Sequence, residues 1–166
     1  RFDDKRLLVI GAGKMAQETL HYLADAGARE IAVLNRDLAR AQTLAEQWRG
    51  HAFAWDALYD QLVTADLVVS TTGADRHVVT LADYQRKVAP RRYQQPQFIL
   101  DLAMPRDFEP AIGEELGVYL YGIDDLSEAC ARNRQARESA LPAAELVATL
   151  VAETQEALDR LAALRE

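Results

Sequence analysis

A glycine-rich turn near the start of the chain carries the most specific chemical signal. Its residues follow a G-x-G-x-x-A pattern and are Gly11, Ala12, Gly13, Lys14, Met15 and Ala16. Gly11 permits a tight turn, Gly13 has no Cβ to keep a diphosphate from the backbone, and Ala16 allows close helix–strand packing. An apolar run over residues 7–10 precedes the turn and a helical pattern follows it, as such a site requires. We predict a dinucleotide phosphate site at the positive end of that helix; a turn without ligand is the alternative.

The segment after the second predicted strand, residues 31–34, indicates which dinucleotide binds. It reads Asn35-Arg36-Asp37. Sites for NAD usually place a carboxylate here, about 20 residues beyond the glycines. The Arg36 guanidinium suits a 2′-phosphate instead, and the neutral Asn35 does not repel one. The segment therefore favours NADP(H). In the alternative Arg36 is solvated, and in either case Asp37 is expected to cap the next helix.

Small hydroxyl residues and a glycine follow the predicted strand at residues 67–70. Ligands of open α/β sheets bind beyond the carboxyl ends of the strands, where the strand order reverses. Small side chains there let a nicotinamide ribose approach the backbone. The predicted cofactor contacts in this segment are Ser70, Thr71, Thr72 and Gly73. A plain turn is the alternative.

The loop over residues 101–107 follows the next predicted strand and is rich in charge. Pro105 stiffens it, and Arg106 lies between carboxylates that could hold it in an ion pair. We predict a structural clasp. A contact to the cofactor or to a partner domain is the alternative.

Composition limits the protein class. The chain has 166 residues, of which 49% are hydrophobic, enough to bury a full core. A net charge of −7 argues against a surface devoted to nucleic acid. Cys130 is the one cysteine, which excludes an intramolecular disulfide framework and is compatible with a cytoplasmic location. The sequence shows no membrane-spanning run and no signal peptide. It starts at Arg1, and we expect it to be a piece of a longer chain.

Strand and helix patterns alternate along residues 1–123. The further strands are expected at 51–55, 98–102 and 118–121, and a helix over 80–89 is expected to end before Pro90. Continuous apolar strands that alternate with helices indicate a parallel sheet covered on both faces. The predicted fold is α/β, a doubly wound parallel sheet of the Rossmann NAD(P)-binding type.

Residues 124–166 form a predicted C-terminal helical segment that is glycine-free and rich in Ala and Glu. Pro142 should start a new helix there or kink a long one. The apolar residues beyond it recur at spacings of three and four and are Ala144, Val147, Val151, Thr154, Leu158 and Leu161. This helix packs on its own sheet, belongs to another domain, or forms a dimer contact; the sequence leaves these three open.

No residue of this chain is predicted to be catalytic or to bind a metal. Cys130 lies in a helical segment without a neighbouring base, as is typical of a small buried hydrophobe. His77 is expected to be a surface loop residue. The basic residues are expected to form a solvated helix end, with contacts to tRNA phosphates as the alternative; they are Arg86, Lys87, Arg91 and Arg92.

The order and spacing of these motifs resemble glutamyl-tRNA reductase. The matching segments are 9–16, Asn35-Arg36, 70–74, Asp-Leu-Ala-Met-Pro-Arg-Asp at 101–107 and 118–126, with Asn133 and Arg137 beyond them. The resemblance covers nearly the whole chain. It identifies the NADPH-binding domain of that family and the start of its long C-terminal helix.

The resemblance implies reduction of glutamyl-tRNA by NADPH to glutamate-1-semialdehyde, for tetrapyrrole (porphyrin and haem) biosynthesis. It implies that the attacking thiol belongs to an N-terminal catalytic domain, so that this chain alone would bind cofactor without turnover. The implied partners are glutamyl-tRNA, the other domains of the same chain and a second copy in a homodimer. A shikimate-dehydrogenase-like NADP reductase domain and a non-catalytic nucleotide-binding module are the alternatives.

Overall fold

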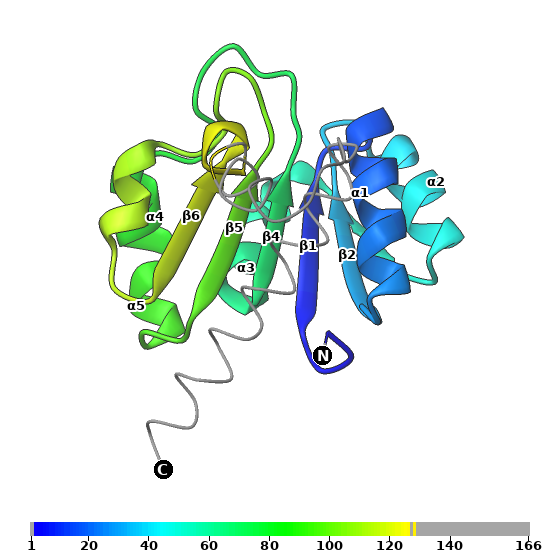
Figure 1. Cartoon of the computed structure of the whole chain (residues 1–166), viewed down its shortest axis with the longest axis horizontal. Helices are drawn as coiled ribbons and strands as arrows, with labels where there is room; N and C mark the ends of the chain where they lie inside the picture. Colours follow the sequence, from blue (N-terminus) through cyan, green and yellow to red (C-terminus); the bar gives the residue numbers. More distant parts are fainter. Residues whose placement is uncertain (1, 127, 129–166) are drawn as a thin grey trace.

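A six-stranded, all-parallel sheet forms the centre of the molecule (Figure 1). The computed structural model describes residues 2–126 and 128. The strand order is β3-β2-β1-β4-β5-β6, with the reversal between β1 and β4 that defines the doubly wound dinucleotide fold. The strands are β1 (Arg6–Ile10), β2 (Glu30–Leu34), β3 (His51–Phe53), β4 (Leu67–Ser70), β5 (Gln97–Asp101) and β6 (Val118–Gly122). The predicted fold class is confirmed.

Helices connect the strands and cover both faces of the sheet. The α-helices are α1 (Lys14–Asp25), α2 (Leu38–Gln47), α3 (Leu58–Thr64), α4 (Leu81–Lys87) and α5 (Ala89–Arg92), and the 3₁₀ turns are η1 (Trp55–Ala57) and η2 (Pro110–Glu114). The α1 helix buries Ala16, Leu20 and Leu23, the stripe that its sequence predicts. It ends before Gly27, whose φ of +106° suits the left-handed position after a helix.

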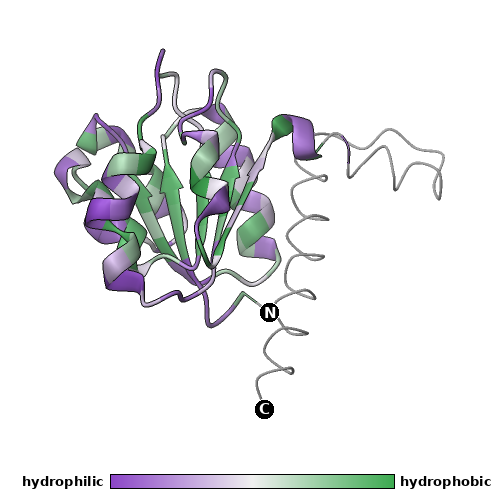
Figure 2. Ribbon diagram, turned by 90° about the vertical axis from the view of Figure 1, so that its left-hand side faces the viewer, coloured by the Kyte–Doolittle hydropathy of each residue, from purple (hydrophilic) through white to green (hydrophobic). Residues whose placement is uncertain are grey.

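Alternation along β1 divides the core into two layers. Leu7 and Val9 pack with residues of α1 and α2, whereas Leu8 and Ile10 pack with residues of α3 and α4. Successive side chains of a strand point to opposite faces, so one apolar run supplies both layers. Figure 2 shows mostly apolar strands between helices that contain both hydrophilic and apolar residues.

Two local boundaries differ from the sequence expectation. The third strand ends at Phe53, and Trp55 begins the 3₁₀ turn η1 instead of extending the strand. The helix expected to end before Pro90 stops at Lys87, and Pro90 lies in the first turn of the separate helix α5. Proline lacks an N–H, and the first turn of a helix does not use that donor, so Pro90 starts a helix here.

The chain continues past β6 in helical conformation at residues 123–126 and 128. The predictions for Cys130, Pro142 and the apolar seam from Ala144 to Leu161 fall outside the described residues. Within the described part of the chain, no helix combines the length and the apolar character that crossing a bilayer demands.

Candidate functional site

The sheet register brings the predicted site segments to one edge. Ile10 pairs with Leu34 on one side and with Ser70 on the other, so three neighbouring strands end level with one another. Ser70 in turn pairs with Asp101 of β5. The glycine turn, the Asn35-Arg36 segment and the loops after β4 and β5 therefore all start from the carboxyl edge. This edge includes the β1/β4 reversal point, where ligands of such sheets bind.

Gly11 is required by two independent features of the turn. Its φ is +104°, a backbone conformation that side-chain-bearing residues rarely adopt. A Cβ at this position would also lie 2.6 Å from Thr71 Oγ1. The Gly11 N–H donates to Leu34 O over 2.8 Å, and the Thr71 N–H donates to Ile10 O over 2.9 Å. The turn is therefore tied to both neighbouring strands.

Gly13 is the N-cap of α1 and leaves the helix terminus open. No side chain caps this terminus, and the first turn contains no acidic residue. A Cβ added at Gly13 would meet no protein atom within 4 Å. Lys14 is 89% exposed and lies 3.8 Å from Glu18, and Met15 is exposed as well. The first N–H groups of a helix have no intrahelical partner, so this terminus offers donors and a positive dipole end to an anion.

The Asn35-Arg36-Asp37 segment extends the same edge beyond β2. Asp37 is the N-cap of α2, and its carboxylate accepts from the Arg40 N–H over 3.3 Å, as predicted. Asn35 Nδ2 donates to Asp37 O over 3.0 Å. Arg36 is exposed, and its guanidinium lies over the Trp55 ring at 5.2 Å from the centroid. The one carboxylate of the segment is thus turned to the helix, and the cation is held at the surface.

Asp107 clasps the loop after β4 to the loop after β5. Its fully buried carboxylate accepts from Ser70 Oγ over 2.6 Å, from the Thr72 N–H over 3.0 Å and from the Thr72 hydroxyl. Ser70 is fully buried as well, whereas Thr71 and Thr72 are half-buried and Gly73 is exposed. The side chains of Ser70 and Thr72 therefore bond within the protein.

Asp101 organises the beginning of the same clasp. This buried carboxylate accepts from the Phe108 N–H over 2.8 Å and from the Ala103 N–H over 3.2 Å. Burial raises the pKa of Asp101, and the negative charge of Asp107 raises it too, although the N–H donors counteract both. Residues 101–107 form a structural clasp, as predicted, but Asp101 and Asp107 hold it through N–H and hydroxyl donors and not through an ion pair with Arg106.

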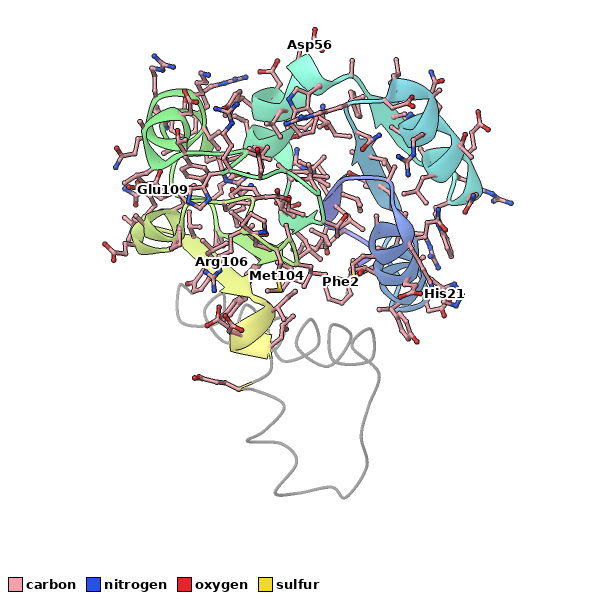
Figure 3. All side chains as sticks on the ribbon, turned by 90° about the horizontal axis from the view of Figure 1, so that it is seen from above. Phe2, His21, Asp56, Met104, Arg106 and Glu109 are labelled. Carbon is pink, nitrogen blue, oxygen red and sulfur yellow. The ribbon has the colours of Figure 1, made fainter. Side chains whose placement is uncertain are left out.

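Arg106 and His77 complete the clasp on its outer side. Arg106 lies 3.6 Å from Asp125 of the helical segment after β6, not against its flanking carboxylates. Figure 3 looks onto this edge and shows Arg106 near that segment. His77 is exposed, as expected, and its Nδ1 lies 3.0 Å from Arg106 O.

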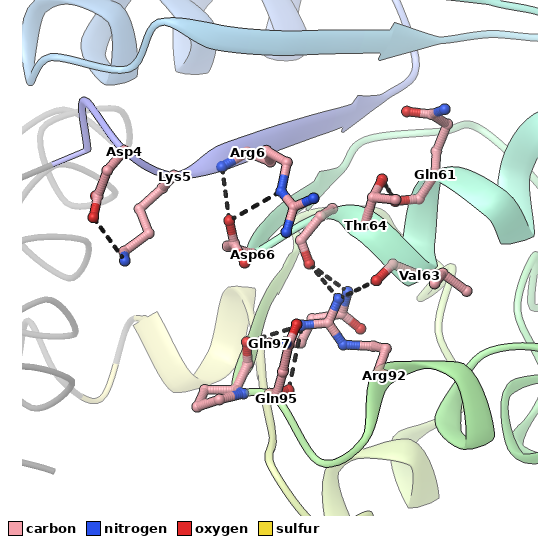
Figure 4. Close-up of polar contacts among 12 residues, drawn as sticks. Asp4, Lys5, Arg6, Gln61, Val63, Thr64, Asp66, Arg92, Gln95 and Gln97 are labelled. Atoms are coloured by element: carbon pink, nitrogen blue, oxygen red, sulfur yellow. Dashed lines mark hydrogen bonds and ion pairs between the residues drawn. The ribbon is translucent and has the colours of Figure 1, made fainter. Parts of the chain in front are cut away.

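Arg92 departs from the solvated helix end that the sequence predicts for the basic residues of α4 and α5. Arg92 is only 4% exposed. Its guanidinium donates to five backbone carbonyls, those of Leu62, Val63, Ala65, Gln95 and Pro96, several of which appear in Figure 4. Burial lowers the pKa of Arg92. The prediction was wrong for Arg92 because the end of α3 presents carbonyls that only a buried donor can satisfy.

The three remaining basic residues of that group are paired at the surface. Arg86 lies 2.7 Å and Lys87 3.0 Å from Asp83, and Arg91 lies 2.8 Å from Asp60. Neighbouring carboxylates offset their charges, so they do not form a free cationic patch. Among the described residues, no group of three or more His, Cys, Asp or Glu side chains could hold a metal ion.

Two residues that matter to this edge were not singled out from the sequence as site residues. Trp55 resembled a strand residue, and Asp107 resembled one of several charges in a loop. Both act on segments distant in sequence, Trp55 on Arg36 and Asp107 on Ser70 and Thr72. The sequence contains one weak indication for each residue. Trp55 is an aromatic residue, and Asp107 a carboxylate, a few residues beyond a strand that ends at the carboxyl edge of the sheet.

Comparison with known proteins agrees with this geometry. The family model of shikimate / quinate 5-dehydrogenase matches residues 1–129. A glutamyl-tRNA reductase from Rhodopirellula baltica is 47% identical over 147 residues, 89% of this chain and 34% of that protein. The chain spans about a third of the length of the curated relatives it matches.

Solved structures give the same result. Glutamyl-tRNA reductase from Methanopyrus kandleri superposes with a TM-score of 0.73 and 34% identity, covering 96% of this chain and 40% of that one. The nucleotide binding domain of glutamyl-tRNA reductase from Thermoplasma volcanium has a TM-score of 0.61, covers 82% of this chain and 87% of that one, and at 17% identity shows the fold alone. The resemblance read from the motifs is confirmed. The chain belongs to the shikimate / quinate 5-dehydrogenase family, and along most of its length it is similar to the glutamyl-tRNA reductases.

Proposed function

We propose that this chain is the NADPH-binding domain of a glutamyl-tRNA reductase. The observation that carries the proposal is the open terminus of α1 at the point where the strand order reverses. The terminus has no side-chain cap and no acid in its first turn, and a Cβ at Gly13 would meet no atom of residues 2–126 and 128 within 4 Å. The similarity to proteins named glutamyl-tRNA reductase supports the choice of enzyme.

The residues fit a nicotinamide dinucleotide along the whole edge. The backbone donors of Ala12, Gly13, Lys14 and Met15 would hold the diphosphate, where free N–H groups and the helix dipole favour a negative charge. Gly11, whose own N–H donates to Leu34 O, would contribute by shaping the turn against the diphosphate. Arg36, with Asn35 beside it, would bind the 2′-phosphate through a charge-assisted, bidentate contact. The Arg36 guanidinium and the neutral Asn35 favour NADP(H) over NAD, whereas the diphosphate contacts are common to both cofactors.

The loop after β4 would lie against the nicotinamide ribose. Thr71 lies against the turn at Gly11, Thr72 and Gly73 follow it, and a Cβ at Gly73 would meet no atom of the described residues within 4 Å. The Ser70 hydroxyl is held by Asp107, so Ser70 would act by fixing this loop. When bound, NADPH supplies the hydride that reduces the glutamyl ester to glutamate-1-semialdehyde for tetrapyrrole biosynthesis.

The remaining parts of the reaction are assigned to the full-length protein. Its partners would be glutamyl-tRNA, the other domains of the same chain and a second copy in a homodimer, in the cytoplasm. No described residue is assigned a catalytic role, so this chain alone should bind NADPH without oxidising it. Glutamyl-tRNA added with NADPH should leave the nicotinamide absorbance unchanged; a steady decrease would contradict this division of labour.

Titration of the chain with NADPH and NADH tests the cofactor assignment. Wild type should bind NADPH more tightly, and Arg36→Ala should lower that affinity about 10- to 100-fold while leaving NADH affinity nearly unchanged, because hydrogen bonds to charged groups contribute about 1.5–3 kcal/mol. Arg91→Ala is the matched control, since it removes an exposed arginine that pairs with Asp60. Equal affinities for both cofactors in wild type would overturn the NADP(H) assignment, and no binding of either would overturn the proposal.

A further inference from the structure

The Arg36 side chain rests on an aromatic ring that the next strand supplies. Its guanidinium carbon lies 5.2 Å from the centroid of the Trp55 ring. The register explains the contact: Leu34 pairs with Phe53 in the parallel β2–β3 ladder, and Arg36 and Trp55 each follow two residues later. The end of β3 therefore places an aromatic side chain beside the end of β2.

Trp55 is packed on the core, whereas its partner Arg36 lies at the surface. The ring is half-buried and packs against the core cluster that contains Leu8 and Leu58. Arg36 is exposed. In residues 2–126 and 128 it forms no ion pair or hydrogen bond, so the ring is the contact that restricts the guanidinium.

The neighbouring polar groups leave this arrangement undisturbed. The Asp37 carboxylate faces the Arg40 N–H, and the Asn35 amide donates to Asp37 O. A cation over an aromatic face is attracted by the ring electrons and uses none of its N–H donors in doing so. Arg36 is therefore both restricted in position and able to bind a phosphate through two donors.

We propose that Trp55 determines cofactor specificity by holding Arg36 in position for the 2′-phosphate of the adenine ribose. This inference rests on the proposed NADPH-binding function and deepens it. Trp55 is a positioning residue: it reduces the conformational freedom that Arg36 loses when the phosphate binds. It should therefore affect ligands that carry the 2′-phosphate and no others.

The test measures binding of 2′-phospho-ADP-ribose and ADP-ribose to the chain by calorimetry. Trp55→Leu should weaken 2′-phospho-ADP-ribose binding about two- to fivefold, the range of an exposed cation–π contact, and leave ADP-ribose binding unchanged. Trp55→Phe, which keeps a ring, should retain most of the preference. In an Arg36→Ala background, Trp55→Leu should have no further effect, because the two residues act as one unit.

Each other outcome overturns the inference in an identifiable way. Equal losses for both ligands would show that Trp55 supports the fold or the adenine. A full preference in Trp55→Leu would show that Arg36 needs no ring. If the leucine variant does not fold, Trp55→Met, a long apolar side chain without a ring, gives the same comparison. A wild type without preference for the 2′-phosphate would overturn the proposed cofactor together with this inference.

Discussion

The turn between β1 and α1 leaves its backbone donors without side-chain caps, whereas the loops after β4 and β5 bond to each other. At the first region, the N-cap Gly13 has no side chain that could bond to the helix N–H groups. A Cβ added there would meet no atom of the described residues within 4 Å. At the second, the Asp107 and Asp101 carboxylates are buried and accept hydrogen bonds from backbone and hydroxyl donors. Both regions lie at the same edge of the same sheet.

The difference assigns separate roles to the two regions. Donors that the protein does not use are available to a ligand, so changes at the open turn should alter binding more than folding. Buried groups that the protein does use are costly to leave unpaired, so changes at the clasp should alter folding first. Four predictions follow, from the largest expected effect to the smallest: those at Asp107, Gly13 and Gly73 test this separation, and the one at Tyr84 tests a buried hydrogen bond outside both regions.

Removal of the clasp carboxylate should have the largest effect. Asp107→Ala leaves two hydroxyls and one N–H in the protein interior without their acceptor, and we expect the free energy of unfolding to fall by about 2–4 kcal/mol. Urea denaturation measures it. Asp75→Ala, which removes an exposed carboxylate from the same loop, is the control and should change stability by less than about 0.5 kcal/mol. Similar effects of the two substitutions would show that the clasp does not stabilise the fold.

A carboxylate placed at the open terminus should separate binding from stability. In Gly13→Asp the added Cβ meets no atom of the described residues within 4 Å, and aspartate is a favourable N-cap, so the melting temperature should stay level or rise. The same carboxylate would occupy the helix N–H groups and repel the diphosphate, and NADPH affinity should fall at least about 100-fold. Gly13→Ala adds volume without charge and therefore measures the steric contribution to the loss of NADPH affinity. Wild-type affinity in Gly13→Asp would place the phosphate site elsewhere.

Tyr84 should make stability depend on pH in the alkaline range. Its buried hydroxyl donates to Gln97 Oε1 over 2.7 Å, and burial raises its pKa to about 12. The unfolded chain ionises near pH 10, so it loses the proton first; stability is constant below pH 10 and falls as the pH rises towards 12. The loss should approach about 3 kcal/mol.

Tyr84→Phe isolates this contribution. The variant should lose about 1 kcal/mol at neutral pH with the hydrogen bond, and its stability should fall less steeply between pH 10 and 12. Tyr59, whose pKa is also raised to about 12, and Tyr121, whose pKa is raised by burial, stay in both proteins and contribute to the remaining slope. Parallel curves for wild type and variant would contradict the assignment to Tyr84.

Substitution of Gly73, the exposed glycine after β4, should have the smallest effect. Gly73→Ala meets no protein atom, so stability should change by less than about 0.5 kcal/mol. If the loop lies against the nicotinamide ribose, the added methyl group should lower NADPH affinity about fivefold, a cost of about 1 kcal/mol. Adenosine 2′,5′-bisphosphate, which lacks that ribose, should bind as in wild type. Unchanged NADPH affinity would favour the plain turn.

Local sequence predicted the strands, the two long helices and the glycine turn well. Leu7 and Val9 alternate with Leu8 and Ile10, and this pattern alone predicts a strand buried on both faces. The Gly11 turn and the Asp37 cap were likewise correct, since backbone conformation and helix capping depend on residues within a few positions of each other.

The errors concern groups whose partners are distant in sequence. Arg92 was predicted to be solvated because the four basic residues of its group, Arg92 included, looked alike; its carbonyl partners at Leu62 and Val63 lie about 30 residues away. The predicted partner of Arg106 was a neighbour in its own loop, whereas Asp125 follows the next strand. Which of several similar charges is buried depends on the acceptors that the fold brings to it.

The sequence by itself determined the sheet, the glycine turn at its carboxyl edge, and the resemblance to a known reductase, because apolar periodicity and glycine spacing act over a few residues. Only the tertiary structure decided which polar groups bind inside the protein and which stay free. Asp107 meets Ser70, and Trp55 meets Arg36, because parallel strands in register bring separate loops to one edge. A hydrogen bond or a ring contact acts over a few ångströms, and no spacing along the chain records that distance.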